Sequence, residues 1–202
     1  MKKMKIAALL MAALIAAVSA AGCNKHKKDP AISNSTNNPN KTYSEIEGVA
    51  EIEHNVSMNE DADVNNTQYK LNRVIDSGVV KDGKKFIYAD ITIKNTSDVE
   101  YEITAINNFY VSLPDGSEIA SQPNTQVYAI NHLNGYEKIS SVGAGEEFNG
   151  YIGFALDTSV TDFTICFFPT GKDYNDKKDV VRTEISAADV IPAPEGMFTP
   201  EE

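Results

Sequence analysis

The sequence has few of the residues that cross-link a small secreted domain. Among its 202 residues there is no tryptophan, and the two cysteines are Cys23 and Cys166. A disulfide-stapled domain normally carries an even set of cysteines inside its folded part, whereas here one lies near the N-terminus and the other in an apolar run. We therefore predict no disulfide, and we expect Cys166 to be a small buried hydrophobic residue rather than a nucleophile.

Patterns for catalysis and metal binding are also missing. The three histidines are His26, His54 and His132, and none is spaced with another histidine or a cysteine as a zinc site requires. The sequence has neither a Gly-x-Ser-x-Gly motif nor a phosphate-binding glycine loop. We therefore expect a protein that is not an enzyme and that needs no cofactor.

Positive charge is scarce. The chain has 29 acidic and 18 basic side chains, and its formal net charge is −11. Nucleic-acid binders carry basic patches, so a chain this acidic would be repelled by nucleic acid, and anionic polymers would repel it too. We therefore expect a solvated acidic surface and no nucleic-acid partner.

Residues 1–22 have the three parts of a secretory signal peptide. Three lysines lie among the first five residues, residues 6–18 are apolar, and small residues occupy 19–22. The apolar run is shorter than the roughly 20 residues that a membrane-spanning helix needs. We predict that this segment is a cleaved signal.

Cys23 directly follows Ala20, Ala21 and Gly22, which resembles the bacterial lipobox, although Ala20 stands where leucine is usual. The resemblance implies that the Cys23 thiol is acylated and that Cys23 becomes the new N-terminus. Two or three acyl chains would hold the protein on a membrane, since one chain binds only marginally. We predict a lipid anchor at Cys23 on the extracytoplasmic face of the bacterial cell membrane. The alternative is a soluble secreted binder without an anchor.

A polar tether is predicted from residue 23 to residue 66. Residues 29–42 are rich in Asn, Ser, Thr, Pro and Lys and have almost nothing apolar to bury, which is typical of disorder. Apolar residues recur at helical spacing within 44–58, where a short amphipathic helix and an extended segment both remain open.

Residues 67–188 have the pattern of an all-β domain. In the clearest strand, residues 86–94, apolar side chains alternate with polar or aromatic ones. Further strands are expected at 69–80, 99–103, 109–113, 148–156, 163–167 and 181–185. About seven short strands without a long helix favour an antiparallel β-sandwich. The tail, 189–202, contains three prolines and is expected to be mostly irregular.

Two segments carry a resemblance to a known family. The first runs from the strand at 86–95 to Gly116, and the second is Gly145-Glu146 followed by Gly150-Tyr151-Ile152-Gly153-Phe154. They resemble an immunoglobulin-like domain of unknown function that occurs on lipoproteins and secreted proteins of Gram-positive bacteria. The resemblance spans about 68–187 and implies an immunoglobulin-like sandwich in an extracellular setting. That family, which is related in fold to a secreted mycobacterial antigen, has no established activity and no catalytic residues to carry over.

Two regions are candidates for contact with a protein or a carbohydrate. Residues 120–142 form the longest expected loop. Six tyrosines lie in or beside strands, where they either form an exposed strip or cover the core. They are Tyr88, Tyr101, Tyr110, Tyr128, Tyr136 and Tyr151.

Two acidic clusters suggest calcium, which binds several carboxylate or amide oxygens. The candidates are Asp61 and Asp63 in one cluster and Asp173 and Asp176 in the other. Neither cluster has the glycine turn and distal glutamate of an EF-hand, so solvated loops are the default interpretation. The sequence thus predicts a non-enzymatic extracellular binding or structural module of unknown ligand, with a calcium-binding or calcium-stabilised domain as the alternative.

Overall fold

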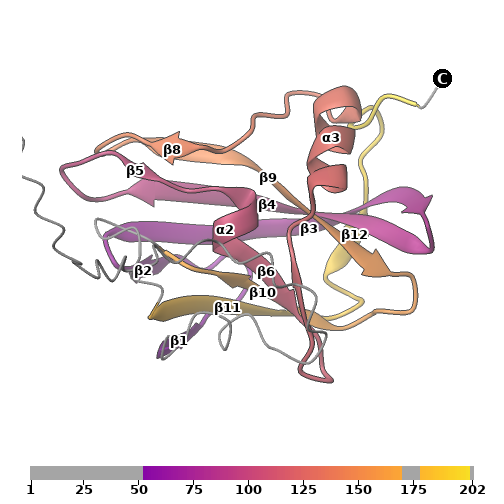
Figure 1. Ribbon diagram of the computed structural model, residues 1–202, viewed down its shortest axis with the longest axis horizontal. Coiled ribbons are helices and arrows are strands. Elements are labelled where there is room, and N and C mark those ends of the chain that lie inside the picture. Colours follow the sequence, from indigo (N-terminus) through magenta and orange to yellow (C-terminus); the bar gives the residue numbers. More distant parts are fainter. Residues whose placement is uncertain (1–51, 170–177, 201–202) are drawn as a thin grey trace, which may run out of the picture. The chain divides into compact units, whose positions relative to one another are not determined.

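Two β-sheets pack face to face in the part of the chain that the computed structural model describes, residues 52–169 and 178–200 (Figure 1). Sheet A has the strand order β1 (Ile52–Asn55), β11 (Asp179–Ile185), β10 (Phe163–Phe167), β6 (Phe109–Ser112), β7 (Glu118–Ala120). Neighbouring strands of sheet A are antiparallel, apart from β1, which runs parallel to β11.

Sheet B contains the longest strands of the domain. Its order is β12 (Val190–Pro192), β3 (Thr67–Lys81), β4 (Lys84–Asn95), β9 (Glu147–Asp157), and β2 (Ala62–Val64) also pairs with β3. A small ribbon is formed by β5 (Tyr101–Glu102) and β8 (Ser141–Val142). The two described helices are α2 (Ala105–Asn108) and α3 (Pro123–His132).

The core lies between the two sheets, and alternation of side chains along each strand produces it. In β4, the apolar residues at positions 87, 89, 91 and 93 are all fully buried and face sheet A. At its centre, the ring of Phe167 stacks on Tyr69 of sheet B at 4.7 Å and on Phe109 at 4.8 Å. The predicted all-β, immunoglobulin-like sandwich is therefore confirmed, with twelve described strands in place of about seven.

The prediction of a long loop at 120–142 is wrong, because this segment contains the ten-residue helix α3. Its buried positions, Thr125, Tyr128, Ala129 and Leu133, have helical spacing, but Val127 and Ile130 point to solvent. Apolar residues on both faces hide the helical period, and Asn, Thr and Val are weak helix formers. Pro123 at the start of the helix was the available signal.

Ordered structure also extends beyond the expected ends of the sandwich. β1 and β2 lie within the range predicted to be a flexible tether, so that prediction is wrong for these two strands. Of the two alternatives for residues 44–58, the helix is wrong for residues 52–55, which form β1. Residues 23–51, with Cys23, lie outside the described residues. β12 lies in the predicted irregular tail and pairs with β3. The strand predicted at 99–103 is shorter than expected, because within it only Tyr101 and Glu102 form strand pairs, and their partner strand is β8.

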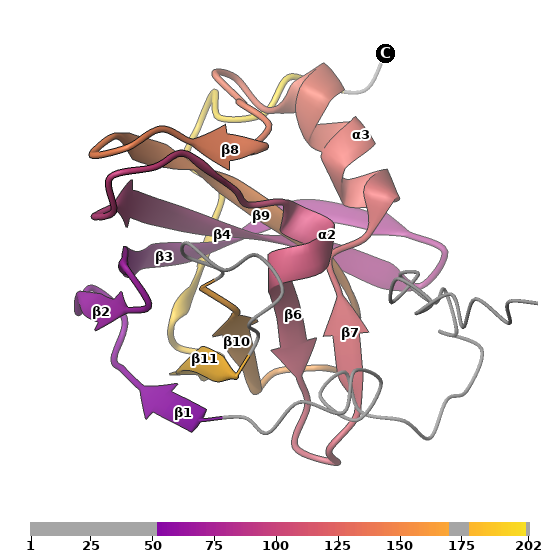
Figure 2. The same ribbon diagram turned by 60° about the vertical axis from the view of Figure 1, so that its left-hand side comes forward.

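Helix α3 covers one half of the outer face of sheet B (Figure 2). Tyr128 of the helix meets Phe86 of β4 edge to face, with ring centroids 5.6 Å apart. The C-terminal segment runs beside the helix, where the N–H of Thr199 donates to the carbonyl of His132 at 2.7 Å and Phe198 packs 5.4 Å from Tyr88. Because these aromatic side chains cover one half of the face, the other half remains for polar side chains.

Candidate binding surface on the outer face of sheet B

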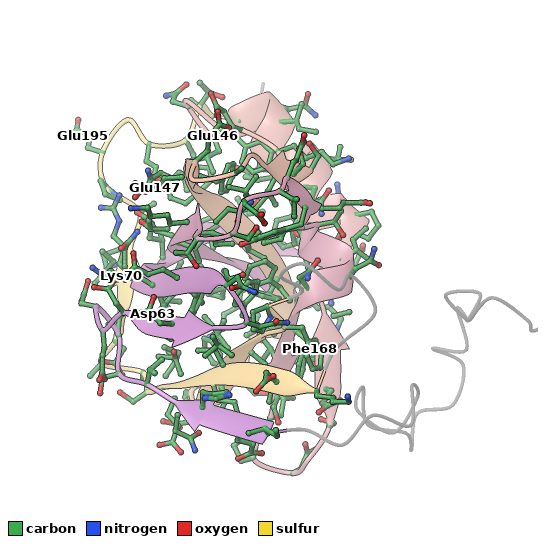
Figure 3. All side chains as sticks on the ribbon, turned by 90° about the vertical axis from the view of Figure 1, so that its left-hand side faces the viewer. Asp63, Lys70, Glu146, Glu147, Phe168 and Glu195 are labelled. Carbon is green, nitrogen blue, oxygen red and sulfur yellow. The ribbon has the colours of Figure 1, made fainter. Side chains whose placement is uncertain are left out.

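The uncovered half of the outer face of sheet B presents a row of polar side chains from three adjacent strands. In the register of the sheet, Asp90 of β4 lies between Arg73 of β3 and Tyr151 of β9, and Thr92 lies beside Asn149. We call this set the polar face; it comprises Lys70, Asn72, Arg73, Asp90, Thr92, Glu147, Asn149 and Tyr151. Figure 3 shows Lys70 and Glu147 on the same side of the domain.

A β-bulge builds the centre of the polar face. The register of β3 against β4 shifts between Leu71 and Arg73, so that Asn72 and Arg73 both reach Asp90. The Arg73 Nε donates to Asp90 Oδ2 at 2.7 Å, and Asn72 Nδ2 donates to Asp90 Oδ1 at 3.1 Å. Both oxygens of one carboxylate are thereby fixed, which sets the orientation of all three side chains.

The exposure of the two charged groups differs. The Asp90 side chain is 17% exposed, and that of Arg73 is 42% exposed. The hydrogen bond to Asp90 raises the pKa of Arg73, partial desolvation opposes this effect, and a second hydrogen bond to Tyr151 supports it. The guanidinium therefore stays charged and presents part of its surface to solvent.

Further hydrogen bonds extend the network to the edge strand β9. Thr92 accepts from Asn72 Nδ2 at 3.0 Å and donates to Asn149 Oδ1 at 2.7 Å. Asn149 Nδ2 in turn donates to Glu147 Oε1 at 2.9 Å. The polar face is thus an ordered array of donors and acceptors held on a sheet, which suits reversible binding of a hydrogen-bonding ligand.

The first predicted calcium cluster does not form a ligand set. Asp61 Oδ1 pairs with Lys70 Nζ at 2.9 Å, and Asp63 is exposed on β2. Within residues 52–169 and 178–200, no three His, Cys, Asp or Glu side chains gather where a metal ion could be held. The other candidates, Asp173 and Asp176, lie outside the described residues, so calcium there stays a prediction.

The tyrosines mostly cover the core instead of forming an exposed strip. Tyr88, Tyr101, Tyr110 and Tyr128 are buried, while Tyr136 and Tyr151 are half-buried. Of the six, Tyr151 contributes its hydroxyl to the polar face. Sequence reasoning missed Asn72, Arg73 and Asp90, and only the alternation along 86–94 could have placed Asp90 on the outer face.

Two other predictions concern the cysteine and the membrane. Cys166 is fully buried beside Tyr110, Phe168 and Val180, which confirms its expected packing role. None of the described helices combines the length and the apolar character that crossing a bilayer would require.

Comparison with known proteins gives a family but no activity. A family model described as "Domain of unknown function (DUF4352)" matches residues 56–179. No curated protein matches the sequence.

Several solved structures are similar in fold. One is a Bacillus subtilis protein provisionally assigned as a lipoprotein, with 17% identity and a TM-score of 0.46 over 66% of this chain and 40% of that chain. An uncharacterised β-sandwich protein from Clostridium difficile has 16% identity and a TM-score of 0.42, over 66% of this chain and 95% of that one. The secreted protein MPT63 from Mycobacterium tuberculosis has 13% identity and a TM-score of 0.41, over 66% and 98% of the two chains. This chain thus spans less than half the length of the Bacillus protein.

Proposed function

Because this chain belongs to the DUF4352 family, whose description names no activity, we propose a function from its own residues. We propose that it is a non-enzymatic binding module, anchored by lipid at Cys23 on the extracytoplasmic face of the bacterial membrane. In this proposal, the polar face binds a neutral carbohydrate. The observation that carries it is the ordered hydrogen-bonding array from Asn72 to Glu147 across three strands.

Several features favour a hydroxyl-rich ligand. Arg73 offers N–H donors beyond the one bound to Asp90, and Asp90 offers carboxylate lone pairs beside it on the sheet. Sugar hydroxyls donate and accept, so one sugar ring can use both kinds of partner. The half-buried Tyr151 ring beside Arg73 adds an apolar surface with a polar tip.

Charge favours a neutral carbohydrate over an acidic one. The cations Arg73 and Lys70 of the polar face are each paired with a carboxylate, Asp90 and Asp61. The chain as a whole carries a formal charge of −11. A polyanion would meet no uncompensated positive patch on the polar face and would be repelled by the net charge.

Binding is tested with the full mature protein against soluble neutral glucans, mannans and chitin fragments, with poly(glycerol phosphate) as the anionic comparison. We expect a neutral polymer to bind, and Arg73→Gln and Asp90→Asn each to weaken binding by about tenfold. Lys84→Gln is the matched control, because Lys84 pairs with Asp157 at 3.5 Å outside the polar face. Tighter binding of the anionic polymer, or equal effects of all three variants, would contradict the proposal.

The anchor is tested separately by intact mass of the mature protein from its native membrane. We expect a mass gain consistent with acylation of Cys23, and its loss in a Cys23→Ser variant. An unacylated protein recovered from the medium would favour the soluble secreted alternative and would leave the carbohydrate experiment unaffected.

A further inference from the structure

A groove opens at one end of the sandwich, on the inner side of sheet B and away from the polar face. Its volume is about 530 Å³, within the range of small-molecule sites. Three separate segments line it: the β3–β4 hairpin, the loop after β9, and the stretch from Ala187 through β12 to Ala193. The lining residues that matter here are Asp76, Gly78, Lys85, Thr161, Val190 and Pro192.

A second β-bulge lies at this groove. The pairing of β3 with β4 shifts between Asp76 and Val80, and Gly78 adopts a left-handed φ of 76° within the bulge. The N–H of Gly78 donates to Asp76 Oδ1 at 2.9 Å. This bond fixes the carboxylate through one oxygen and leaves the other oxygen able to accept a hydrogen bond from a ligand.

Lys85 supplies the opposite charge to the same groove. Its Nζ donates to the carbonyl of Val160 at 2.6 Å, which places the half-buried ammonium on the groove wall. An ammonium has three N–H donors, so two remain. Within the described ranges, no carboxylate lies within 4.0 Å of the Lys85 ammonium, and no cation lies within that distance of Asp76.

Asp76 and Lys85 line the same groove without pairing with each other, so each can bind a ligand group of the opposite charge. Val190 and Pro192 of β12 form the apolar part of the wall beside them. We propose that the groove binds a small zwitterion, namely a short peptide with free termini or a free amino acid. The ligand's ammonium binds Asp76, its carboxylate binds Lys85, and a small side chain contacts Val190 and Pro192. This site goes beyond the proposed carbohydrate binding and does not depend on it.

The test uses the full mature protein in detergent micelles and calorimetry with three related probes. They are the dipeptide Ala-Ala, its N-acetyl form without the ammonium, and its C-terminal amide without the carboxylate. We expect Ala-Ala to bind and each blocked form to bind at least about tenfold more weakly, because each loses a charge-assisted contact. No heat with Ala-Ala at about 10 mM, or equal binding of all three probes, would overturn the proposal.

Variants assign the two ends of the ligand. Asp76→Asn should abolish the preference for a free ammonium, and Lys85→Gln should abolish the preference for a free carboxylate. Asp157→Asn and Lys84→Gln are the matched controls, because this exposed pair joins β9 to β4 next to Lys85 but does not line the groove. If a groove variant fails to fold, the three probes still decide the question on the unmodified protein. Arg73→Gln should leave dipeptide binding unchanged, so failure of the carbohydrate proposal is separable from failure of this one.

Discussion

The side-chain oxygen Oε1 of Gln122 accepts a hydrogen bond from the backbone N–H of Ala155 at 2.7 Å, on the outer edge of sheet B. One residue earlier, Ser121 Oγ donates to the carbonyl of Gly153 at 2.8 Å. β9 is the last strand of its sheet, and such strands expose backbone groups that can pair with another chain. The segment that leads into α3 therefore protects part of this edge with side chains in place of a further strand.

Removal of the Gln122 amide should destabilise the domain. In Gln122→Ala, the partly buried N–H of Ala155 loses its acceptor, and we expect the free energy of unfolding to fall by about 1–2 kcal/mol. Urea denaturation measures the change. Gln126→Ala, one helical turn further along α3, removes the same side chain from a half-buried position and should cost less than about 0.5 kcal/mol. Equal losses in both variants would mean that the edge contact does not stabilise the fold.

Gly153 should not tolerate a side chain. A Cβ at this position would lie 2.6 Å from Oγ1 of Thr125, which belongs to α3, and 2.9 Å from Cε1 of Tyr88, which packs under this helix. We expect Gly153→Ala to lower the free energy of unfolding by about 1–3 kcal/mol, because the helix must shift. At Gly143, the three atoms nearest to such a Cβ all belong to the flexible side chain of Glu146, so Gly143→Ala should be nearly neutral. Thermal unfolding of both variants gives the comparison, and similar melting temperatures would refute the close approach of α3.

The ion pair of the polar face should contribute more to stability than an exposed pair. Asp90→Ala leaves Arg73 and Asn72 without their shared acceptor, and we expect a loss of about 1–2 kcal/mol. Asp157→Ala removes an acid that is 62% exposed and should cost less than about 0.5 kcal/mol. Denaturant titrations at low and high salt check this, and a larger effect at Asp157 would contradict the ordered network described for the polar face.

Alkaline pH should destabilise the fold through buried tyrosines. Burial raises the pKa of Tyr69 and of Tyr88 above the ordinary value of 10.0, so the unfolded chain loses these protons first. The stabilising contribution is complete below pH 10, and above it the free energy of unfolding should fall by about 1.4 kcal/mol per pH unit for each tyrosine. Unfolding measured between pH 9 and pH 11 tests the slope.

Tyr69→Phe separates the contribution of one residue. The Tyr69 hydroxyl is buried, and none of the described residues forms a hydrogen bond with it, so its removal should be neutral or slightly stabilising at pH 7. The variant should also lose part of the alkaline slope, because one raised pKa is gone. If the free energy of unfolding of Tyr69→Phe falls with pH as steeply as that of the wild type, the pKa of the Tyr69 phenol is not raised by folding.

Local rules in the sequence account for the strands of the sandwich. The alternation at 86–94 correctly predicts that Ile87, Ala89, Ile91 and Ile93 face the core. The same rule could not predict that Tyr88, on the opposite side of the strand, is buried as well. That burial depends on α3 and Phe198, which lie far away in the sequence. Helix α3 itself was missed because its apolar residues lie on both faces.

The sequence by itself determined the sandwich class, the inward face of its strands and the absence of a histidine–cysteine metal pattern, because these depend on residue type and local period. Only the tertiary structure decided the binding surfaces. A bulge is a mismatch between two paired strands, so neither strand alone shows that Asn72 and Arg73 converge on Asp90. The groove likewise exists only because strand pairing brings Asp76, Lys85 and Val190 to one end of the sandwich.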